Sequence, residues 1–331
     1  MRIAIVKPPI IGSFIRGVGF YTQRLYQGLI DLGISVELVD FSWNENFAAG
    51  FDLIHYSYFD PFFLTLPVIK RQKLVITIHD LIPLIFSESF PRGIRGEIKW
   101  QLQKRLLHFS DAVITVSKAS KADIVKQINF PESKIFVTYE AADKIFKPIK
   151  IKKEEFVLYV GGTNWNKNVI TLVKACQKIK MPLVLVGKEF VNKNIDFSNV
   201  ENQPLKEILD AARMTNNIRF LGFVKTKELV KLYNQAKAYV QPSIYEGFGL
   251  PVLEAMACGT PVICGRNSSL LEIAGDAATY ADITDPNDLA DKIRNIKATG
   301  QEITQAQKFS WEKTAKETLI VYESIHNCSR L

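Results

Sequence analysis

The sequence predicts an α/β protein built from two doubly wound domains, each a parallel sheet covered by helices on both faces. Short apolar runs alternate with segments of helical periodicity along nearly the whole chain, and this alternation is typical of parallel strands joined by crossover helices. The length of 331 residues also exceeds one ordinary hydrophobic core and fits two domains of roughly 150 residues each.

The first half of the chain contains six apolar runs that we expect to be strands, at 3–6, 34–39, 52–56, 73–78, 112–116 and 134–139. The helical pattern over 20–33 lies between the first two runs and ends at Gly33, a residue type that commonly stops helices. At 144–155 the apolar pattern lapses, and Pro148 lies in a cluster of lysines. This segment is therefore expected to be an exposed linker.

The second half repeats the alternation, with strands expected at 156–160, 183–186, 218–223, 238–242, 261–264 and 278–281. Helical patterns cover 168–179, 226–238, 288–296 and 311–325. The expected organisation is an N-terminal domain over 1–148, a second domain over 149–310, and a C-terminal helix within 311–331. The apolar side of that last helix must pack on another element, and we expect it to return to the first domain.

The amino-acid composition indicates which kinds of molecule the protein can bind. The net charge of +8 favours an anionic partner, which is a nucleotide, a phospholipid surface or a nucleic acid. No block of five or more like charges marks a nucleic-acid tail, so no nucleic acid is expected. The chain starts without a signal-peptide pattern and has no apolar stretch that could span a bilayer, which predicts a cytoplasmic protein.

The four cysteines, Cys176, Cys258, Cys264 and Cys328, form no C-x-x-C pair. With only four histidines in the chain, a metal cluster is not expected. Buried thiols in a reducing cytosol are the better interpretation than a disulfide framework.

The stretch PSIYEGFGLPVLEAMACGTPV, at 242–262, is the most informative motif. A glycine loop follows an expected strand and leads into a helix, where Pro251 suits the first turn. Ligands of doubly wound sheets bind outside the carboxyl ends of the strands. The helix start offers N–H groups to phosphate, and Glu246 and Glu254 offer carboxylates to sugar hydroxyls. The pattern indicates a nucleotide-sugar site, with an ordinary glycine turn as the alternative, in which Glu254 only favours the helix dipole.

This stretch closely resembles the signature of the retaining GT-B glycosyltransferases, the large mannosyl- and glucosyltransferase group of the family 4 type. Six further segments resemble the same family in the same order, at 17–39, 78–91, 114–127, 156–175, 218–224 and 309–324. The resemblance implies two facing Rossmann-like domains with a cleft between them. It also implies transfer of a hexose from a nucleotide diphosphate sugar to an acceptor hydroxyl, with the anomeric configuration retained.

The resemblance assigns roles to individual residues. Glu246 would bond the hydroxyls of the donor sugar, Glu254 the ribose hydroxyls, and Lys167 the diphosphate, although one lysine at a helix start can also be merely solvated. His79 would face the donor sugar. The other expected donor-binding positions are Gly247, Phe248, Gly249, Leu250, Gly161, Gly162, Gly17, Gly19 and Val224. Asp80 and Ser117 are either acceptor contacts or turn and helix caps.

One position departs from the family pattern. Family members often carry an arginine directly after the glycine that follows the strand, and here that place is Gly162. Lys188 and Arg266, each directly after a strand and its glycine, are the candidate replacements. Loss of this cation weakens transition-state stabilisation unless another group compensates, so a homologue that binds the donor without turnover stays open.

The donor and acceptor follow from the resemblance. The overall pattern is most similar to bacterial mannosyltransferases of polysaccharide assembly, so GDP-mannose is the expected donor and a UDP-linked hexose the alternative. The acceptor would be a glycan, a polyprenyl-diphosphate-linked glycan or a lipopolysaccharide core. No D-x-D motif occurs, so neither a metal nor another cofactor is expected. A nicotinamide dehydrogenase is disfavoured because no G-x-G-x-x-G follows the first strand.

The basic segment at 91–110 has a helical pattern that allows two interpretations. Arg92, Arg95 and Lys99 fall on one side of the expected helix, while Ile94, Ile98, Leu102 and Leu106 fall on another. This pattern predicts either contact with an anionic membrane surface or lipid diphosphate, or an ordinary helix with a solvated face. The first interpretation would make the protein peripheral at the inner face of the membrane.

Overall fold

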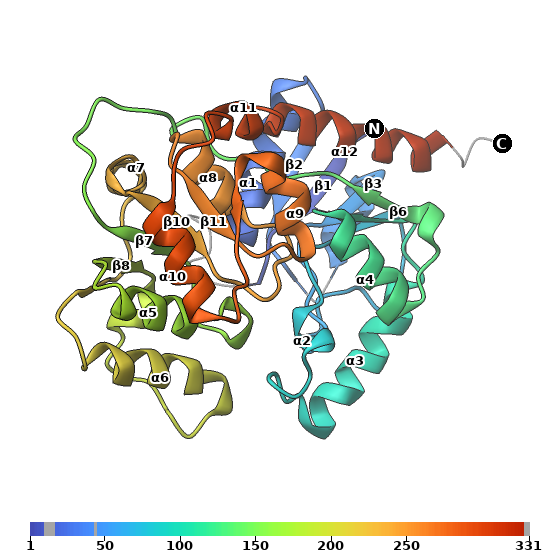
Figure 1. Ribbon diagram of the computed structural model, residues 1–331. Coiled ribbons are helices and arrows are strands. Elements are labelled where there is room, and N and C mark those ends of the chain that lie inside the picture. The colour runs from blue at the N-terminus through green and yellow to red at the C-terminus, as the bar shows by residue number, and fades with distance from the viewer. Residues whose placement is uncertain (10–16, 43–44, 328–331) are drawn as a thin grey trace. The chain divides into compact units, whose positions relative to one another are not determined.

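The computed structural model (Figure 1) describes residues 1–9, 17–42 and 45–327. The chain forms two compact units, of which unit 1 comprises Met1–Glu140 with Phe309–Leu331, and unit 2 comprises Ala141–Lys308. Each unit contains a six-stranded sheet in which every neighbouring pair of strands is parallel. The α/β class with two doubly wound sheets is therefore confirmed.

The sheet of unit 1 has the order β2-β1-β3-β4-β5-β6. Its strands are β1 (Ile3–Val6), β2 (Val36–Val39), β3 (Leu53–Tyr56), β4 (Lys73–Ile78), β5 (Ala112–Thr115) and β6 (Ile135–Val137). In the sheet, β2 lies on one side of β1 and β3 lies on the other side of β1. The strand order thus reverses between β1 and β3, and the crevice for a ligand in such sheets lies at the carboxyl ends next to this reversal.

Helices cover both faces of this sheet. They are α1 (Val18–Asp31), α2 (Ile82–Ile85), α3 (Gly93–Leu107), α4 (Lys118–Ile128) and α12 (Trp311–Asn327), with short 3-10 helices η2 (Glu45–Gly50) and η3 (Glu132–Lys134). Alternate residues of β1, Ala4 and Val6, join a core cluster with Trp100 of α3 and Ile124 of α4. The strands are apolar on both sides because helices cover both faces.

The C-terminal helix α12, red in Figure 1, packs against α1 and also contacts β4 and β5. Its contact with α1 is close, since a Cβ atom added at Gly28 would lie 2.7 Å from the Cβ of Ala315. Tyr322 of α12 reaches the sheet, where its hydroxyl lies 2.5 Å from Nδ1 of the buried His55. Thr314 Oγ1 of α12 also donates to the carbonyl of Tyr139 at 2.5 Å, so tertiary packing and hydrogen bonds together hold α12 on unit 1.

The sheet of unit 2 has the order β12-β11-β10-β7-β8-β9. Its strands are β7 (Val157–Val160), β8 (Leu183–Val186), β9 (Ile218–Leu221), β10 (Ala238–Gln241), β11 (Val262–Cys264) and β12 (Thr279–Tyr280). The chain runs from β7 to β8 and β9, and then returns to β10 on the other side of β7. The strand order reverses between β7 and β10, the two central strands.

Two layers of helices enclose this second sheet. The layer of α5 (Val169–Lys178), α6 (Gln203–Ala212) and α10 (Pro286–Asn295) shares one core cluster with the sheet. The helices α7 (Thr226–Gln235), α8 (Leu250–Ala257), α9 (Ser268–Ala274) and α11 (Glu302–Ala306) form the rest, and α8 contacts the other three. Short 3-10 helices are η4 (Trp165–Lys167), η5 (Lys188–Val191), η6 (Val200–Asn202) and η7 (Gly275–Ala277).

The segment expected to be an exposed linker differs from that expectation in one respect. Most of its side chains are exposed, but Phe146 is buried against the ring of Tyr233. The backbone N–H of Ile149 also donates to the side-chain oxygen of Asn234 at 2.9 Å. The segment therefore packs on α7 of unit 2 through an aromatic contact and a hydrogen bond, which its lysine-rich composition does not predict.

The cysteines match their expected role where the structure describes them. Cys176, Cys258 and Cys264 are free and buried, and Cys328 lies outside the described residues. Burial raises the pKa of each of the three thiols to about 12. They stay protonated at neutral pH and are poor nucleophiles.

Candidate functional site

Two loops meet at the strand-order reversal of unit 2, where β7 and β10 end. The backbone N–H of Ile244, after β10, donates to the carbonyl of Asn166, after β7, at 2.8 Å. The side-chain amide of Asn166 donates in return to the carbonyl of Tyr245 at 3.0 Å. These two bonds align the loops, and they bring Lys167 next to Glu246.

Glu246 is a buried carboxylate with several donors. Lys167 Nζ lies 2.8 Å from its Oε1 and 2.7 Å from its Oε2. Gln241 Nε2 donates to Oε1 at 2.8 Å and Ser243 Oγ at 2.6 Å. The side chain of Glu246 is only 8% exposed, while that of Lys167 is 25% exposed. Because a buried charge needs a partner and hydrogen bonds, the carboxylate is fixed in one orientation, and the partly exposed side chain of Lys167 lies beside it.

The loop backbone is fixed by the start of α9. Ser269 Oγ bonds the carbonyls of Glu246 at 2.9 Å and of Phe248 at 2.7 Å. Ser268 Oγ accepts from the N–H of Glu246 at 3.0 Å. Gly247, Phe248 and Gly249 are buried. The two serines were not identified from the sequence, since nothing in the local pattern of α9 distinguishes them from ordinary helix-start residues.

Gly249 requires glycine for two reasons. Its φ of +105° lies in the left-handed region, which side chains disfavour. A Cβ atom there would also lie 2.8 Å from Leu270 Cδ2. The residue caps α8, which begins at Leu250 and has proline in its first turn, so the glycine loop and the helix start form one rigid turn.

Glu254 lies on α8 and is buried, with 7% of the residue exposed. Tyr233 of α7 donates its hydroxyl to Oε2 of Glu254 at 2.9 Å. The predicted carboxylate is therefore anchored by a neighbouring helix. Tyr233 was not identified from the sequence because it reads as one apolar position of an amphipathic helix.

The two glycines that follow β7, Gly161 and Gly162, differ in whether a Cβ atom would fit at their positions. A Cβ atom at Gly161 would lie 2.6 Å from the hydroxyl oxygen of Tyr159, which itself donates to the carbonyl of Gly162 at 2.6 Å. A Cβ atom at Gly162 would meet only Asn164 Oδ1, at 3.4 Å, which is ordinary contact. Gly161 is therefore required by packing, whereas the place of the expected arginine, Gly162, has room for a Cβ atom.

The candidate replacement cations are both exposed, and they follow strands on opposite sides of the central pair β7 and β10. Lys188 begins η5 after β8. Arg266 follows β11 and places its guanidinium over the ring of Tyr280, with 4.8 Å from Cζ to the ring centroid. Arg266 is also close in sequence to Ser268, whose hydroxyl accepts a hydrogen bond from the N–H of Glu246. Val224, predicted for the donor, follows the edge strand β9, two strands away from β7.

His79 follows β4 in unit 1, and both of its ring nitrogens are engaged. Nδ1 lies 3.1 Å from Oε1 of Glu140, and Nε2 lies 3.1 Å from the carbonyl of Ser57, which follows β3. The ring also packs at a right angle to that of Tyr21, with 4.7 Å between centroids. Glu140 was not identified from the sequence, because it is 61 positions from His79 and belongs to no motif.

The other residues predicted in unit 1 have structural contacts. Asp80 Oδ1 accepts from the N–H of Ile82 at 3.0 Å. Ser117 is the N-cap of α4 and accepts from the N–H of Ser120 at 3.0 Å. Gly17, with φ of +67°, is the N-cap of α1 and Gly19 is buried in its first turn. Ser117 and Asp80 thus both act as caps, and a role of any of these residues toward a ligand stays a prediction.

The predicted membrane residues lie on α3 at the surface of unit 1. Arg95 and Lys99 are exposed. Arg92 is the N-cap residue and forms an ion pair with Glu97 at 2.7 Å.

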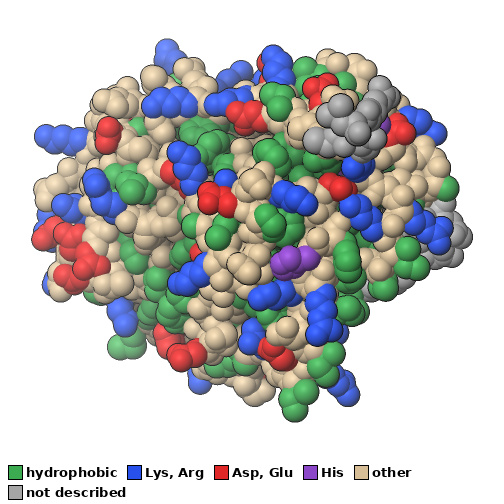
Figure 2. Space-filling model, turned by 90° about the vertical axis from the view of Figure 1, so that its right-hand side faces the viewer, with side chains coloured by type: hydrophobic (Ala, Val, Ile, Leu, Met, Phe, Trp, Pro, Cys, Tyr) green, Lys and Arg blue, Asp and Glu red, His purple; other side chains and the backbone are tan. Residues whose placement is uncertain are grey.

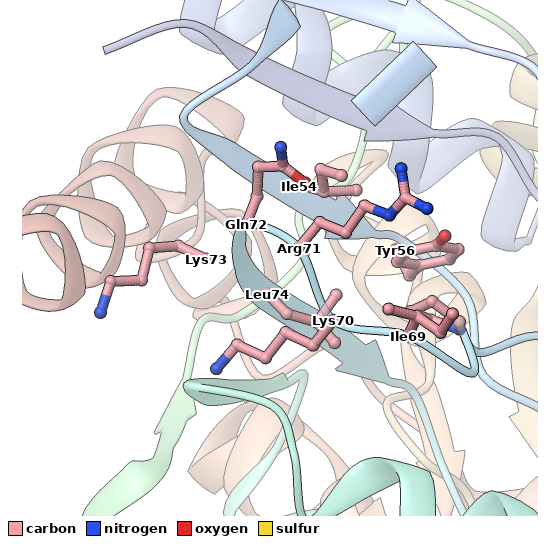
Figure 3. A pocket seen from close by; sticks show the side chains of 9 residues that line it. Ile54, Tyr56, Ile69, Lys70, Arg71, Gln72, Lys73 and Leu74 are labelled. Carbon is pink, nitrogen blue, oxygen red and sulfur yellow. The ribbon is translucent and has the colours of Figure 1, made fainter. Parts of the chain in front are cut away.

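One hollow of unit 1 lies away from these residues (Figure 3). It is lined by residues of β3, of β4 and of the segment before β4, including Ile54, Tyr56, Arg71 and Gln72. It lies at the amino-terminal side of β4, whereas His79 follows the carboxyl end. Within the described ranges, no group of three or more His, Cys, Asp or Glu side chains is placed to hold a metal ion. None of the helices in those ranges combines the length and the apolar character that crossing a membrane requires.

Comparisons with known proteins agree with this geometry. Residues 141–313 match the family described as Glycosyl transferases group 1, and residues 42–144 match Glycosyltransferase Family 4. The chain is 30% identical to O-antigen chain mannosyltransferase B of Escherichia coli over 77% of this chain and 71% of that protein. It is also 30% identical to O-antigen chain mannosyltransferase RfbU of Salmonella typhimurium, over 74% of this chain and 66% of that protein.

Two solved structures show the same fold at low identity. Sucrose-phosphate synthase from Thermosynechococcus elongatus has a TM-score of 0.76 at 20% identity, covering 99% of this chain and 100% of that one. Anabaena HepE, in complex with UDP and glucose, has a TM-score of 0.71 at 18% identity, covering 98% and 100%. These likenesses concern the fold alone.

Proposed function

Because the chain belongs to the glycosyl transferases of group 1, we propose that it moves a hexose from a nucleotide diphosphate sugar to a hydroxyl of a glycan or lipid-linked glycan. The observation that carries this proposal is the Lys167–Glu246 pair at the strand-order reversal of unit 2. A cation and a carboxylate lie side by side there, at the edge where such sheets bind ligands.

The donor would use the two members of this pair differently. Its diphosphate is a multiple anion that would attract the ammonium group of Lys167. Its sugar hydroxyls would donate to Glu246, which Gln241 and Ser243 continue to hold when Lys167 turns to the phosphate. The site can thus exchange an internal ion pair for two contacts with the donor without losing the orientation of the carboxylate.

The start of α8 would complete the site. A helix N-terminus carries partial positive charge and N–H groups that favour phosphate. Glu254, held by Tyr233, would accept hydrogen bonds from the ribose hydroxyls. Together with Lys167, the helix start would stabilise the charge that grows on the leaving diphosphate, which is the largest catalytic contribution open to such a site.

The transfer would proceed on one face of the sugar. The leaving phosphate would take the proton of the acceptor hydroxyl as the new glycosidic bond forms and the bond to the phosphate breaks, so the configuration is retained. Neither glutamate is then a nucleophile, in contrast to retaining hydrolases. Nuclear magnetic resonance of the product, which distinguishes the two anomers, tests retention.

The donor we propose is GDP-mannose, supported by two relatives named as O-antigen mannosyltransferases. The acceptor would be a growing glycan or a polyprenyl-diphosphate-linked glycan. A UDP-hexose is the second candidate, since the structure of HepE contains UDP and glucose. Work in the cytoplasm and independence of metal ions stay predictions, and activity in excess EDTA tests the latter.

Thermal unfolding with a panel of GDP-, UDP- and dTDP-sugars tests donor choice. A ligand at 100 times its Kd stabilises the native state by about 2.7 kcal/mol, so the true donor should raise the melting temperature by several degrees. We expect GDP-mannose to give the largest rise. A larger rise with a UDP-sugar would show that the donor is a UDP-sugar. No rise with any sugar nucleotide would contradict a donor site.

A homologue that binds the donor without turnover is the other candidate function, and Gly162 is the reason for it. Release or transfer of label from a radiolabelled nucleotide sugar separates the two functions. A donor that raises the melting temperature but is never turned over would favour the binding-only function.

A further inference from the structure

Lysine and arginine side chains are scattered among acidic and uncharged ones on the face that Figure 2 shows. Such charges are surrounded by water and interact weakly with one another. A charge inside the protein is different, because each buried charge needs a partner and hydrogen bonds. The buried carboxylate of Glu246 therefore depends on the groups that surround it.

The two oxygens of Glu246 have different partners. Oε1 receives three donors, which are Lys167 Nζ at 2.8 Å, Gln241 Nε2 at 2.8 Å and Ser243 Oγ at 2.6 Å. Among the residues that the structure describes, Oε2 receives Lys167 Nζ alone, at 2.7 Å. Because a carboxylate oxygen has about two lone-pair sites, Gln241 and Ser243 already fill those of Oε1.

The hydrogen bonds to Oε1 have a fixed direction. An ionised carboxylate only accepts hydrogen bonds, so the amide of Gln241 must turn its N–H groups toward Glu246. One N–H group donates to Glu246 Oε1, and the other donates to Ser243 Oγ at 2.6 Å. Ser243 in turn donates its own proton to Glu246. The amide oxygen of Gln241 consequently points away from the carboxylate and needs a donor of its own.

Tyr239 supplies that donor. Its hydroxyl donates to the amide oxygen of Gln241, while the carbonyl of Val160 is more distant, at 3.4 Å. Tyr239 is fully buried, and burial raises the pKa of its hydroxyl well above the usual range, so the hydroxyl keeps its proton. Tyr239, Gln241 and Ser243 thus form one chain in which every hydrogen bond donates toward Oε1 of Glu246.

We propose that Tyr239 and Gln241 are positioning residues, which occupy Oε1 of Glu246 and leave Oε2 as the oxygen that accepts from the donor sugar. This rests on the proposed function, in which the sugar is the ligand of Glu246. When Lys167 turns to the diphosphate, Oε2 would have both lone-pair sites open, and Oε1 would keep Gln241 and Ser243. One oxygen with two open sites fits two neighbouring hydroxyls of a hexose.

A second tyrosine allows a comparison within the same core. Tyr233 packs edge-on against Tyr239, with 5.6 Å between the ring centroids, and donates its hydroxyl to Glu254 Oε2 at 2.9 Å. The two hydroxyls belong to adjacent rings but act on different carboxylates. In the proposed function Glu246 accepts from the sugar and Glu254 from the ribose, so loss of each hydroxyl should have a different effect.

Isothermal titration calorimetry of the full chain with GDP-mannose and with GDP tests the proposal. Both ligands carry the ribose and a diphosphate, and only GDP-mannose carries the sugar. Y239F leaves the amide oxygen of Gln241 buried without its donor, so its affinity for GDP-mannose should fall about tenfold. Its affinity for GDP should equal that of the wild type. If the thermal panel favours a UDP-sugar, that sugar nucleotide and UDP replace the two ligands.

Two further variants separate the sugar from the nucleotide. Q241M should have the same selective effect as Y239F, whereas Y233F should weaken the binding of GDP-mannose and of GDP to the same extent. In Q241M the hydroxyl of Tyr239 can still donate to the carbonyl of Val160, so this variant keeps the test if Y239F is unstable.

A double variant and a distant tyrosine are the controls. If Tyr239 acts through Gln241, Y239F/Q241M should bind GDP-mannose like Q241M alone. Y322F removes a hydroxyl that is equally buried, but in unit 1, where it contacts His55. It should bind both ligands like the wild type.

Three results would overturn the positioning role. The first is an equal loss of affinity for GDP-mannose and GDP in both Y239F and Q241M, which a merely structural defect would produce. The second is wild-type affinity of both variants for GDP-mannose. The third is additive losses in Y239F/Q241M. Each of these leaves the donor site standing, whereas a wild type that binds no sugar nucleotide contradicts the proposed function and the positioning role together.

Discussion

Glu246 illustrates how much of the site is decided by single residues. Its carboxylate receives hydrogen bonds from Lys167 after β7 and from Gln241 and Ser243 on its own side of the site. Motif spacing identified both charged residues from the sequence. Gln241 and Ser243 were not identified, because uncharged polar residues at a strand end are common and only the folded loop shows that they aim at the carboxylate.

Replacing Glu246 tests whether it is a hydrogen-bond acceptor or a nucleophile. E246Q keeps the shape and one acceptor oxygen but loses the charge, so we expect kcat to fall about 10- to 100-fold, the value of a hydrogen bond to a charged group. Transfer kinetics and mass spectrometry of the enzyme with donor check this. A covalent sugar–enzyme adduct at Glu246 would contradict the one-face mechanism.

A substitution at Gly162 is expected to raise kcat, whereas the substitution of Glu246 is expected to lower it. G162R restores a cation where family members often carry one, and the site has room for its Cβ atom. If the arginine adds one charge-assisted bond to the diphosphate, kcat should rise about tenfold.

The control is the neighbouring glycine. G161A forces a Cβ atom to within 2.6 Å of the Tyr159 hydroxyl and should lower the melting temperature, as overpacking does. Unchanged kcat in a well-folded G162R would show that another group already supplies the charge.

At the level of elements, the apolar runs predicted every strand of the part of the chain that the structure describes, and the errors are at the ends. The structure shortens the runs 34–39 and 278–281 to Val36–Val39 and Thr279–Tyr280, because a strand extends only as far as its neighbour pairs with it. Gly33 was correctly expected to follow a helix, and its φ of +76° shows why glycine stands there. Which side of α3 is buried was not predictable, since apolar residues occur all around that helix.

The contact between α1 and α12 gives an element-scale prediction. Alanine in place of an internal helical glycine normally stabilises a protein by about 1 kcal/mol. G28A instead places a methyl group 2.7 Å from the Cβ of Ala315, and overpacking costs about 1–3 kcal/mol. We expect G28A to lower the unfolding free energy in urea titrations. The double variant G28A/A315G should recover most of the loss, and additive effects of the two changes would contradict direct contact.

At the scale of the whole molecule, the two doubly wound sheets follow from the alternation of elements, whereas their strand order and the buried polar network of unit 1 do not. His55 is fully buried between the hydroxyls of Tyr322 and Thr77, at 2.5 and 2.7 Å. In the sequence it is only a lone histidine within an apolar strand. Its partners come from α12 and β4, so no local pattern could indicate them.

This network predicts a pH dependence of stability. Burial, and to a smaller extent the charge of His79, lowers the pKa of His55 from 6.5 to about 3. The unfolded chain therefore binds a proton that the folded chain does not between these values. Stability from His55 is complete above pH 6.5 and falls below it by about 1.4 kcal/mol per pH unit. Urea titrations of the wild type and of H55N from pH 7 to about pH 5 check this. Equal slopes in the two proteins would contradict it.

In the proposed reaction, Lys167 stabilises the leaving diphosphate of a nucleotide sugar. The most direct test is the rate of label release or transfer from radiolabelled GDP-mannose by the wild type, K167Q and K174Q, the last changing an exposed lysine of α5. We expect turnover by the wild type and K174Q, and a loss of about 100-fold or more in kcat for K167Q. Equal rates in all three proteins, or no turnover by the wild type with any nucleotide sugar, would contradict it.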